Sequence, residues 1–586
     1  MTRTSDSDAA AAESDWAATN EESVPARVLD RLLAWRRSHL GGLSGPGLAL
    51  AVLWYVSANT PSLLPRPWWL QGLIAAVCAV IGYAVGYLLG ALWNGLAGWA
   101  GLRITMDRRR ARALLWVWLA VLALGVLAFP ILTIAWQEYV TAYVGQEPPG
   151  WRYPLGSSLV AVVTFALLIS LWRLIAGLAD WFLRRVRSRI VRETVARTLA
   201  SALTVLTVVA ITNYVVVPAV LTVVGRSADR VNRSAPQGLS APTSGLRSGG
   251  PGSAHSWDSL GQDGAIFVSS GPDAGGIQSA TGRAAVEPIR VFVGWQQPIE
   301  PTVQQVLAEM DRTRAWDRRA ILLVTATSTG YTNNWSVASF EYLLGGDTAA
   351  VSFAYSDLPS AFGLITAGDE PREASRALLD AVRARIAALP AGQRPRLYLT
   401  GESLGAFGGD AAFDSPQQML EQADGAVWSG TPGFSPNRGV LTAERNPGST
   451  SVAPVVDNGA HFRFAGDAAQ LRADQFGRPL GDWSFPRVAY LQHPSDPVAW
   501  WSPSLLFESP DWLRETRLDN PMALMSWTPF VTFWQLSADM LVSNNVPGGF
   551  GHRYYGAEMV PAWAAVLGDD RPASALEPII DAVGRR

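Results

Sequence analysis

Apolar residues are concentrated in the first part of the chain, where five long apolar stretches follow one another. They cover approximately residues 44–60, 69–97, 112–136, 156–181 and 198–224. A helix needs about 20 apolar residues to cross the hydrocarbon core of a membrane. The run from Leu114 to Ile134 contains no charged residue, which makes it too long for a buried helix of a soluble core. The pattern predicts a five-helix transmembrane domain over residues 44–225, after a disordered cytoplasmic segment over residues 1–43.

Arginines gather in alternate connections between these stretches. The segment before the first stretch, the second connection and the fourth connection each hold an arginine cluster, whereas the first connection holds Arg66 and the third holds Arg152. Clusters of basic residues mark the cytoplasmic side of a membrane. We therefore expect a multi-pass protein of the cell (plasma) membrane with a cytoplasmic N-terminus, and we expect everything after residue 225 to be extracytoplasmic.

The pattern changes after residue 225. Residues 226–284 are rich in Gly, Ser, Pro and Ala, which predicts a linker. From residue 285 to residue 586, short β-rich runs alternate with helical segments such as 302–313 and 371–389; the runs are Ile289–Gly294, Ala320–Thr325, Ala349–Tyr355, Arg396–Thr400, Gly425–Trp428 and Val488–Gln492. Strands that alternate with helices predict a doubly wound, mostly parallel sheet. Such a sheet carries its active site at the carboxyl ends of its strands.

Composition narrows the classes of function. The net charge of −2 lacks the basic field that recruits nucleic acid, so we expect no nucleic-acid partner. Cys78 is the only cysteine, which excludes an intramolecular disulfide framework and a multi-cysteine metal site. The sequence also contains no lysine, and this excludes a Schiff-base lysine and a P-loop.

The clearest motif follows the predicted strand Arg396–Thr400. Gly401-Glu-Ser-Leu-Gly405 reads G-x-S-x-G and leads into a helical stretch of small residues. In this strand–turn–helix context the serine occupies a sharp turn that exposes its hydroxyl as a nucleophile. Ser403 is therefore the predicted nucleophile, and Gly401 and Gly405 leave room for the tight crossing.

A nucleophilic serine needs a histidine base and an acid that orients it, in the chain order Ser, Asp or Glu, His for this fold. His552 lies in a glycine-flanked loop near the C-terminus and is the predicted base. Asp496 follows the predicted strand that ends at Gln492 and is the predicted acid. His493 is interpreted as a structural neighbour of Asp496. The alternatives for the acid, which do not follow the end of a predicted strand, are Asp482, Glu508, Asp511 and Asp539.

The developing charge of an acyl-transfer reaction needs backbone N–H donors, which form an oxyanion hole. One donor is expected from Leu404, the residue after the nucleophile. The second is expected from the loop after the strand Ala320–Thr325, with Thr327 or Ser328 as the alternatives.

Six segments carry a resemblance: Thr60–Arg66 (TPSLLPR), Ser256–Gly261 (SWDSLG), Tyr355–Ser360 (YSDLPS), Gly401–Gly405 (GESLG), Ser495–Val498 (SDPV) and Gly551-His552. Together they resemble the actinobacterial membrane-anchored α/β-hydrolase family, in which a multi-span N-terminal region is fused to a hydrolase domain. The resemblance covers the chain from about residue 44 onward and implies the α/β-hydrolase fold with its triad. The family's C-terminal segment commonly reads Gly-His-Gly-His. Phe550 replaces the first of these histidines, which points to His552 as the base.

These features predict a membrane-anchored serine esterase that cleaves a lipid or cell-envelope acyl ester through an acyl-enzyme, without a cofactor or metal ion. An acyltransferase with the same triad is one alternative. A non-catalytic membrane scaffold or lipid-binding protein is another, although an intact triad argues against it. Residues 431–486 lie where such folds often insert a lid. The aromatic-rich stretch 499–534 is either ordinary core or a wall that binds an acyl chain.

Overall fold

The computed structural model describes residues 43–101, 107–125, 129–187, 192–219, 238–295, 298–356, 368–515 and 521–584. The chain divides into two compact units. One comprises the described residues of Met1–Tyr55 and Ala79–Gly125, and the other comprises those of Val56–Cys78 and Val126–Arg586. The predicted cytoplasmic segment 1–43 lies outside the described residues except for its last position.

The N-terminal region is helical, and its described helices are α3 (Gly45–Ala58), α4 (Trp68–Trp99), α5 (Arg108–Ala123), α6 (Phe129–Leu132), α7 (Ile134–Tyr143), α8 (Arg152–Arg187) and α9 (Glu193–Ile211). Three segments of the described chain are long and apolar enough to cross a membrane, namely α4, α8 and the continuous helical segment Glu193–Ala219. These three fit a membrane-anchoring region. Helices α8 and α9 pack against each other.

Neither of the other two predicted spans is a single helix of spanning length within the described residues. Helix α3 has 14 residues, or about 21 Å at 1.5 Å per residue, which is short of a hydrocarbon core of about 30 Å. It ends shortly before Pro61, because a proline disfavours helical geometry in the residue that precedes it. In the third predicted span the described residues form α5, α6 and α7, and residues 126–128 lie outside them. The count of five spanning helices therefore stays a prediction.

A seven-stranded parallel sheet organises the C-terminal half. Its strands are β1 (Ile289–Val293), β2 (Ala320–Thr325), β3 (Thr348–Phe353), β4 (Arg396–Glu402), β5 (Gly425–Ser429), β6 (Phe462–Ala465) and β7 (Arg487–Leu491). They are ordered β1-β3-β2-β4-β5-β7-β6, and every pairing is parallel. This arrangement confirms the predicted fold class. The central strands are continuous apolar runs because both faces of the sheet are covered.

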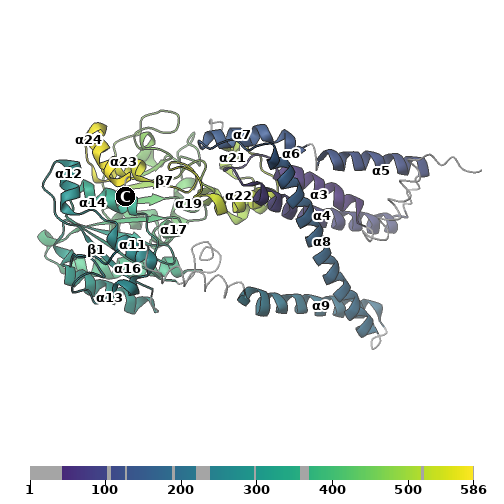
Figure 1. The fold of residues 1–586 in the computed structure, drawn as a ribbon, viewed down its shortest axis with the longest axis horizontal. Coiled ribbons are helices and arrows are strands. Elements are labelled where there is room, and N and C mark those ends of the chain that lie inside the picture. Colours follow the sequence, from purple (N-terminus) through teal and green to yellow (C-terminus); the bar gives the residue numbers. More distant parts are fainter. Residues whose placement is uncertain are drawn as a thin grey trace, which may run out of the picture. The chain divides into compact units, whose positions relative to one another are not determined.

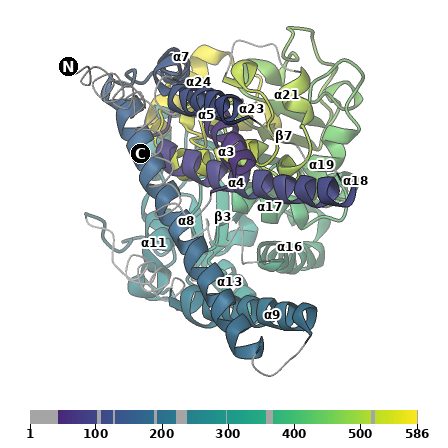
Figure 2. The same cartoon turned by 90° about the vertical axis from the view of Figure 1, so that its right-hand side faces the viewer.

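Helices cover the sheet on both faces (Figures 1 and 2). One face packs against α13 (Ile299–Thr313), α16 (Glu370–Ala388) and α17 (Leu404–Ala411). The other packs against α11 (Gly261–Ser269), α14 (Asn334–Leu343) and α23 (Gly556–Leu567), with α12 (Ala274–Thr281) and α24 (Ala573–Gly584) outside them. Alternate strand residues serve the two cores: Leu323 and Leu399 face the first, whereas Leu322 and Tyr398 face the second.

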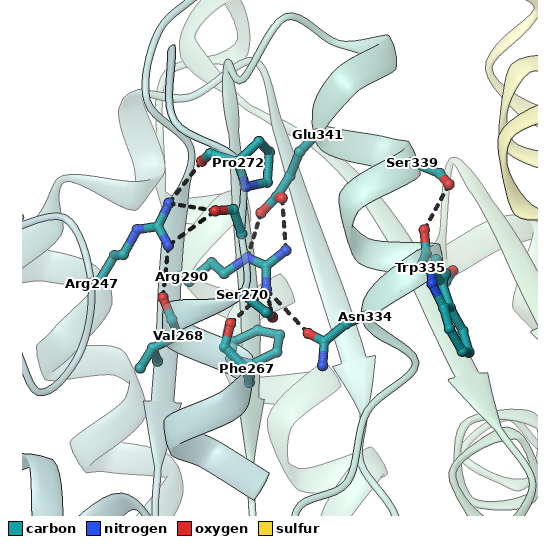
Figure 3. A network of polar contacts seen from close by, with 12 residues as sticks. Arg247, Phe267, Val268, Ser270, Pro272, Arg290, Asn334, Trp335, Ser339 and Glu341 are labelled. Atoms are coloured by element: carbon teal, nitrogen blue, oxygen red, sulfur yellow. Dashed lines mark hydrogen bonds and ion pairs between the residues drawn. The ribbon is translucent and has the colours of Figure 1, made fainter. Parts of the chain in front are cut away.

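Much of the predicted linker is folded onto the sheet edge. The backbone of Arg247 forms an isolated parallel β-bridge with that of Arg290 in β1. The guanidinium of Arg247 donates to the carbonyls of Val268 (2.8 Å) and Pro272 (2.7 Å). Figure 3 shows this network beside Arg290, which is held by Glu341. Residues 238–284 therefore belong to the same domain as the sheet, held by buried arginines and by apolar side chains such as Phe267 and Val268 of α11. Residues 226–237 of the predicted linker lie outside the described residues.

The range predicted as a lid, 431–486, also contains regular structure. It holds α19 (Pro436–Ala443) and the edge strand β6, where Phe462 is in register with Val488 of β7. Strand β6 has only four residues, too short for an alternation pattern to reveal.

Candidate active site

A strained turn presents Ser403 between β4 and α17. Ser403 has φ 59° and ψ −124°, a left-handed conformation that costs a non-glycine residue about 1–3 kcal/mol. Its backbone N–H donates to the carbonyl of Ser429 at the end of β5 (3.1 Å). Strain of this kind persists only where the surrounding structure enforces it. The side chain is partly exposed at the carboxyl edge of the sheet.

Close contacts with backbone atoms explain why the motif has glycine at positions 401 and 405. A β-carbon at Gly405 would collide with the carbonyl oxygen of Thr325, and one at Gly401 would lie 2.6 Å from the carbonyl carbon of Gly405. Both approaches involve backbone atoms, which cannot move aside cheaply. The crossing of β4 and α17 beside the end of β2 therefore requires glycine at both positions.

Asp496 and His552, far apart in sequence, form a buried pair. Nδ1 of His552 lies 2.8 Å from Oδ2 of Asp496. The same carboxylate oxygen accepts from the hydroxyl of Tyr554 (2.8 Å), and Oδ1 accepts from the N–H of Val498 (2.9 Å). Asp496 caps α20 (Pro497–Trp500), directly after β7, so the strand end and the helix start fix its side chain. Within the described residues, Asp496 is the carboxylate bonded to His552.

The imidazole of His552 lies beside the elbow. A β-carbon at Gly430 would collide with Cε1 of His552, and the preceding residue, Ser429, holds the N–H of Ser403. Nε2 of His552 is buried and has no hydrogen-bond partner among the described residues. Because Nδ1 faces a carboxylate, the neutral ring carries its proton there, and Nε2 keeps a lone pair available to a nearby hydroxyl. Catalytic hydrogen bonds often tighten only when substrate binds.

His493 supports this pair from behind. Its ring stacks on Tyr554 with centroids 4.1 Å apart, and its Nε2 lies 2.6 Å from Oε1 of Glu558. Its Nδ1 contacts the carbonyl of Gly551, which precedes His552. The ring therefore holds both the tyrosine that donates to Asp496 and the backbone before His552.

Glu402 is a feature that the motif alone does not reveal. Its side chain is buried, and its carboxylate accepts from Nδ2 of Asn333 and from the hydroxyl of Tyr331 (3.2 Å). Burial raises the pKa of Glu402, although the charge of His552 opposes this effect. The sequence contained a signal for the burial of Glu402, because the last residues of a central strand are buried on both faces.

The two alternatives for the second oxyanion donor differ. The N–H of Thr327 donates to the carbonyl of Tyr331 (2.9 Å) and is therefore engaged within its own loop. Ser328 is fully buried, and its carbonyl accepts from Tyr355 and Ser356. Leu404 is the first residue of α17, where N–H groups have no acceptor within the helix. The engaged N–H of Thr327 leaves Ser328 as the remaining alternative for the second donor, and the oxyanion hole stays a prediction.

In the described part of the chain, no group of three or more His, Cys, Asp or Glu side chains is placed to hold a metal ion.

A parallel sheet with a strained serine after β4, and with an acid and then a histidine after β7, defines an α/β-hydrolase domain. Comparison with known families agrees. Residues 289–576 match the family described as "Alpha/beta-hydrolase family", and residues 60–272 match "Alpha/beta-hydrolase family N-terminus". The two matches together indicate an α/β-hydrolase family with its own N-terminal region. No curated protein and no solved structure matches the chain.

The electrostatics of His552 predict a pH effect. Burial lowers the pKa of its imidazole, but the charges of Asp496 and, to a smaller extent, Glu402 outweigh burial and raise this pKa above 6.5. A base must be neutral, so activity is expected to fall as pH decreases through this raised pKa. In Asp496→Asn the raising charge is lost. The acid limb of the residual kcat/KM profile is then expected at lower pH than in the wild type, while the maximum falls.

Profiles of kcat/KM against pH for the two proteins measure this shift, with Glu402→Gln expected to move the limb less in the same direction. An acid limb that stays in place in Asp496→Asn would assign it to a group other than His552.

Proposed function

We propose that this chain is a membrane-anchored serine hydrolase that cleaves a lipid or cell-envelope acyl ester. The single observation that carries the proposal is the strained Ser403 at a sheet edge where His552, bonded to the buried Asp496, lies beside the neighbouring strand end. Oγ of Ser403 attacks the ester carbonyl while Nε2 of His552 takes its proton. Asp496 holds the ring and stabilises the imidazolium.

The remaining steps use the same groups. The tetrahedral oxyanion is stabilised by the amides of Leu404 and Ser328. His552 returns the proton to the departing alcohol and leaves Ser403 acylated. It then removes a proton from water, which attacks the acyl-enzyme and releases the carboxylic acid. An acyltransferase would differ only in that an alcohol replaces this water.

A line of aromatic side chains supports an acyl substrate. Phe407 on α17, one turn after Ser403, contacts Phe434 with ring centroids 5.4 Å apart. Phe434 contacts Trp501 (6.0 Å), and Trp501 contacts Phe533 on α22 (Val531–Val542) at 5.3 Å. These rings are only partly buried, unlike those of the sheet core. They extend from the nucleophile helix into the aromatic-rich stretch, as an acyl-binding wall requires.

The kcat/KM for p-nitrophenyl esters is expected to rise as the acyl chain lengthens from acetyl to octanoyl, because each buried CH₂ contributes about 0.8 kcal/mol. Rates measured across the ester series test this. The variant Phe434→Ala should flatten the dependence, whereas Phe476→Ala, at an exposed ring, should not change it. A strong preference for acetyl esters would instead favour deacetylation of an envelope polymer.

The connections expected outside the cytoplasm support an extracytoplasmic hydrolase domain. In the first connection, the N–H of Leu63 donates to Asp539 on α22 (3.1 Å). In the third, Nε2 of Gln146 donates to the carbonyl of Asn545 (2.7 Å). Both segments belong to arginine-poor connections. Because they contact the domain, the connections and the domain lie on the same side of the membrane. The positive-inside pattern assigns that side to the exterior.

A further inference from the structure

A cavity away from Ser403 opens where two membrane-type helices begin. Its volume is about 620 Å³, within the usual range for ligand sites. Three segments of the chain supply its walls: the loop before α4, the connection from α7 to α8, and the end of α22. Its polar lining residues are Arg66, Gln137, Thr141, Gln146, Glu147, Arg152, Tyr153 and Asn545.

Arg66 is the unusual member of this lining. Its side chain is completely buried, and its Nη1 and Nη2 atoms have no hydrogen-bond acceptor among the described residues. Its one ionic neighbour is Oδ1 of Asp539, 3.3 Å from Nε. Tyr153 also lines the cavity, and its buried hydroxyl has no hydrogen-bond partner in the described part of the chain. Buried donors without acceptors are rare in folded proteins, and each calls for an explanation such as a bound ion.

Asp539 does not satisfy the guanidinium by itself. Its Oδ2 is already occupied by the hydroxyl of Ser62 and the N–H of Leu63. The terminal nitrogens of Arg66 therefore still lack an oxygen acceptor. Arg152 adds a second positive charge to the lining, and Glu147 adds one negative charge.

Two helix N-termini add to the attraction for an anion. Helix α4 begins at Trp68 and α8 begins at Arg152, and both residues line the cavity. The first N–H groups of a helix and its dipole favour negative charge at this end. The donors thus include the terminal nitrogens of the Arg66 guanidinium, a phenol hydroxyl and helix ends, a set suited to an oxyanion with several acceptor oxygens.

We propose that this cavity binds a phosphate group, through Arg66 and Tyr153, with the head group of an anionic membrane lipid as its source. A guanidinium and a phosphate match in charge and in bidentate geometry. Trp68 and Trp151, at the starts of the two helices, are exposed beside the cavity, as tryptophans are at the head-group level of a membrane.

Thermal unfolding of the full chain in uncharged maltoside micelles tests the proposal. One titration uses inorganic phosphate, against chloride of equal ionic strength, and the other uses an ether-linked phosphatidylglycerol that an esterase cannot cleave. Ligands that bind the folded state raise the unfolding midpoint. We expect the lipid to raise it, and the apparent affinity to fall about 10-fold or more in Arg66→Gln, because a charge-assisted contact is lost.

Tyr153→Phe is the decisive variant. Since its hydroxyl has no partner, removing it should leave the ligand-free midpoint unchanged, while affinity falls about 3-fold or more. If Arg66→Gln impairs folding by leaving Asp539 buried without its partner, the double variant Arg66→Gln/Asp539→Asn takes its place, because it removes both charges of the pair. Arg385→Gln, at an exposed arginine paired with Asp311, is the matched control and should bind like the wild type.

The source of the phosphate follows from the two titrations. Stabilisation by the lipid alone supports a head-group site, and equal stabilisation by inorganic phosphate supports a site for the free ion. If neither probe stabilises the wild type, or if Arg66→Gln and Tyr153→Phe bind both probes as the wild type does, the cavity holds water only and the proposal is overturned.

Discussion

Ester hydrolysis is expected to fall about 10⁴-fold or more when Ser403 is replaced by Ala, with no loss of folded protein from the membrane fraction. The variant removes the nucleophile, while the N–H that bonds to Ser429 remains. His552→Ala should lose a similar factor, because the serine hydroxyl then has no base. Residues of a triad act as a unit, so the double variant should be hardly worse than either single one.

Rates on a p-nitrophenyl ester that the wild type cleaves, measured for purified full-length variants, provide the comparison. Ser449→Ala is a suitable control, since its hydroxyl bonds only to the local carbonyl of Asn446 in the segment after α19. It should retain wild-type activity. Residual hydrolysis in Ser403→Ala close to that of the control would assign the chemistry to another nucleophile.

The largest expected loss of stability follows from Arg290→Met. Arg290 is fully buried, and its Nε and Nη2 each donate to one oxygen of Glu341 at 2.8 Å. Its Nη1 donates to the carbonyl of Phe267 and to Asn334 (Figure 3). Methionine leaves the Glu341 carboxylate buried without its partner, which costs about 3–5 kcal/mol of the free energy of unfolding. That is a large part of the stability of a typical domain.

Thermal or denaturant unfolding in mild detergent measures this loss. The double variant Arg290→Met/Glu341→Leu should recover much of it, because two apolar side chains then replace the whole pair. Arg385→Gln again serves as the exposed control, where an ion pair contributes little. A single Arg290→Met variant as stable as this control would show that the pair does not anchor the folded linker segment to the sheet.

The strands and the elbow were predictable because local patterns specify them. Apolar runs flanked by turn residues located six of the seven strands, including the β4 segment that delivers Ser403. Chain order suggested Asp496 and His552, and the fold brings these two side chains into contact. Their roles in catalysis stay predictions.

Other features could not be predicted from the sequence, because they depend on contacts between distant residues. Residues 238–284 have a linker-like composition, and their fold depends on the carbonyls around Arg247 and Arg290 and on the packing of Phe267 against the sheet. Strand β6 is too short for a pattern, and it forms by pairing with β7. Apolar composition also does not show where a helix ends, as at Ala58 in α3. The terminal guanidinium nitrogens of Arg66, which lack acceptors among the described residues, are likewise visible only once α22 and α8 are in place.

The central claim is that Ser403 is an activated nucleophile, and covalent labelling tests it most directly. A fluorophosphonate probe added to membranes that contain the full-length protein should label the wild type, and mass spectrometry should locate the adduct on the peptide that contains Ser403. The probe should label the His552→Ala variant far more slowly than the wild type, because the base that activates the hydroxyl is absent. An unlabelled wild-type protein, or an adduct on a serine other than Ser403, would contradict the account.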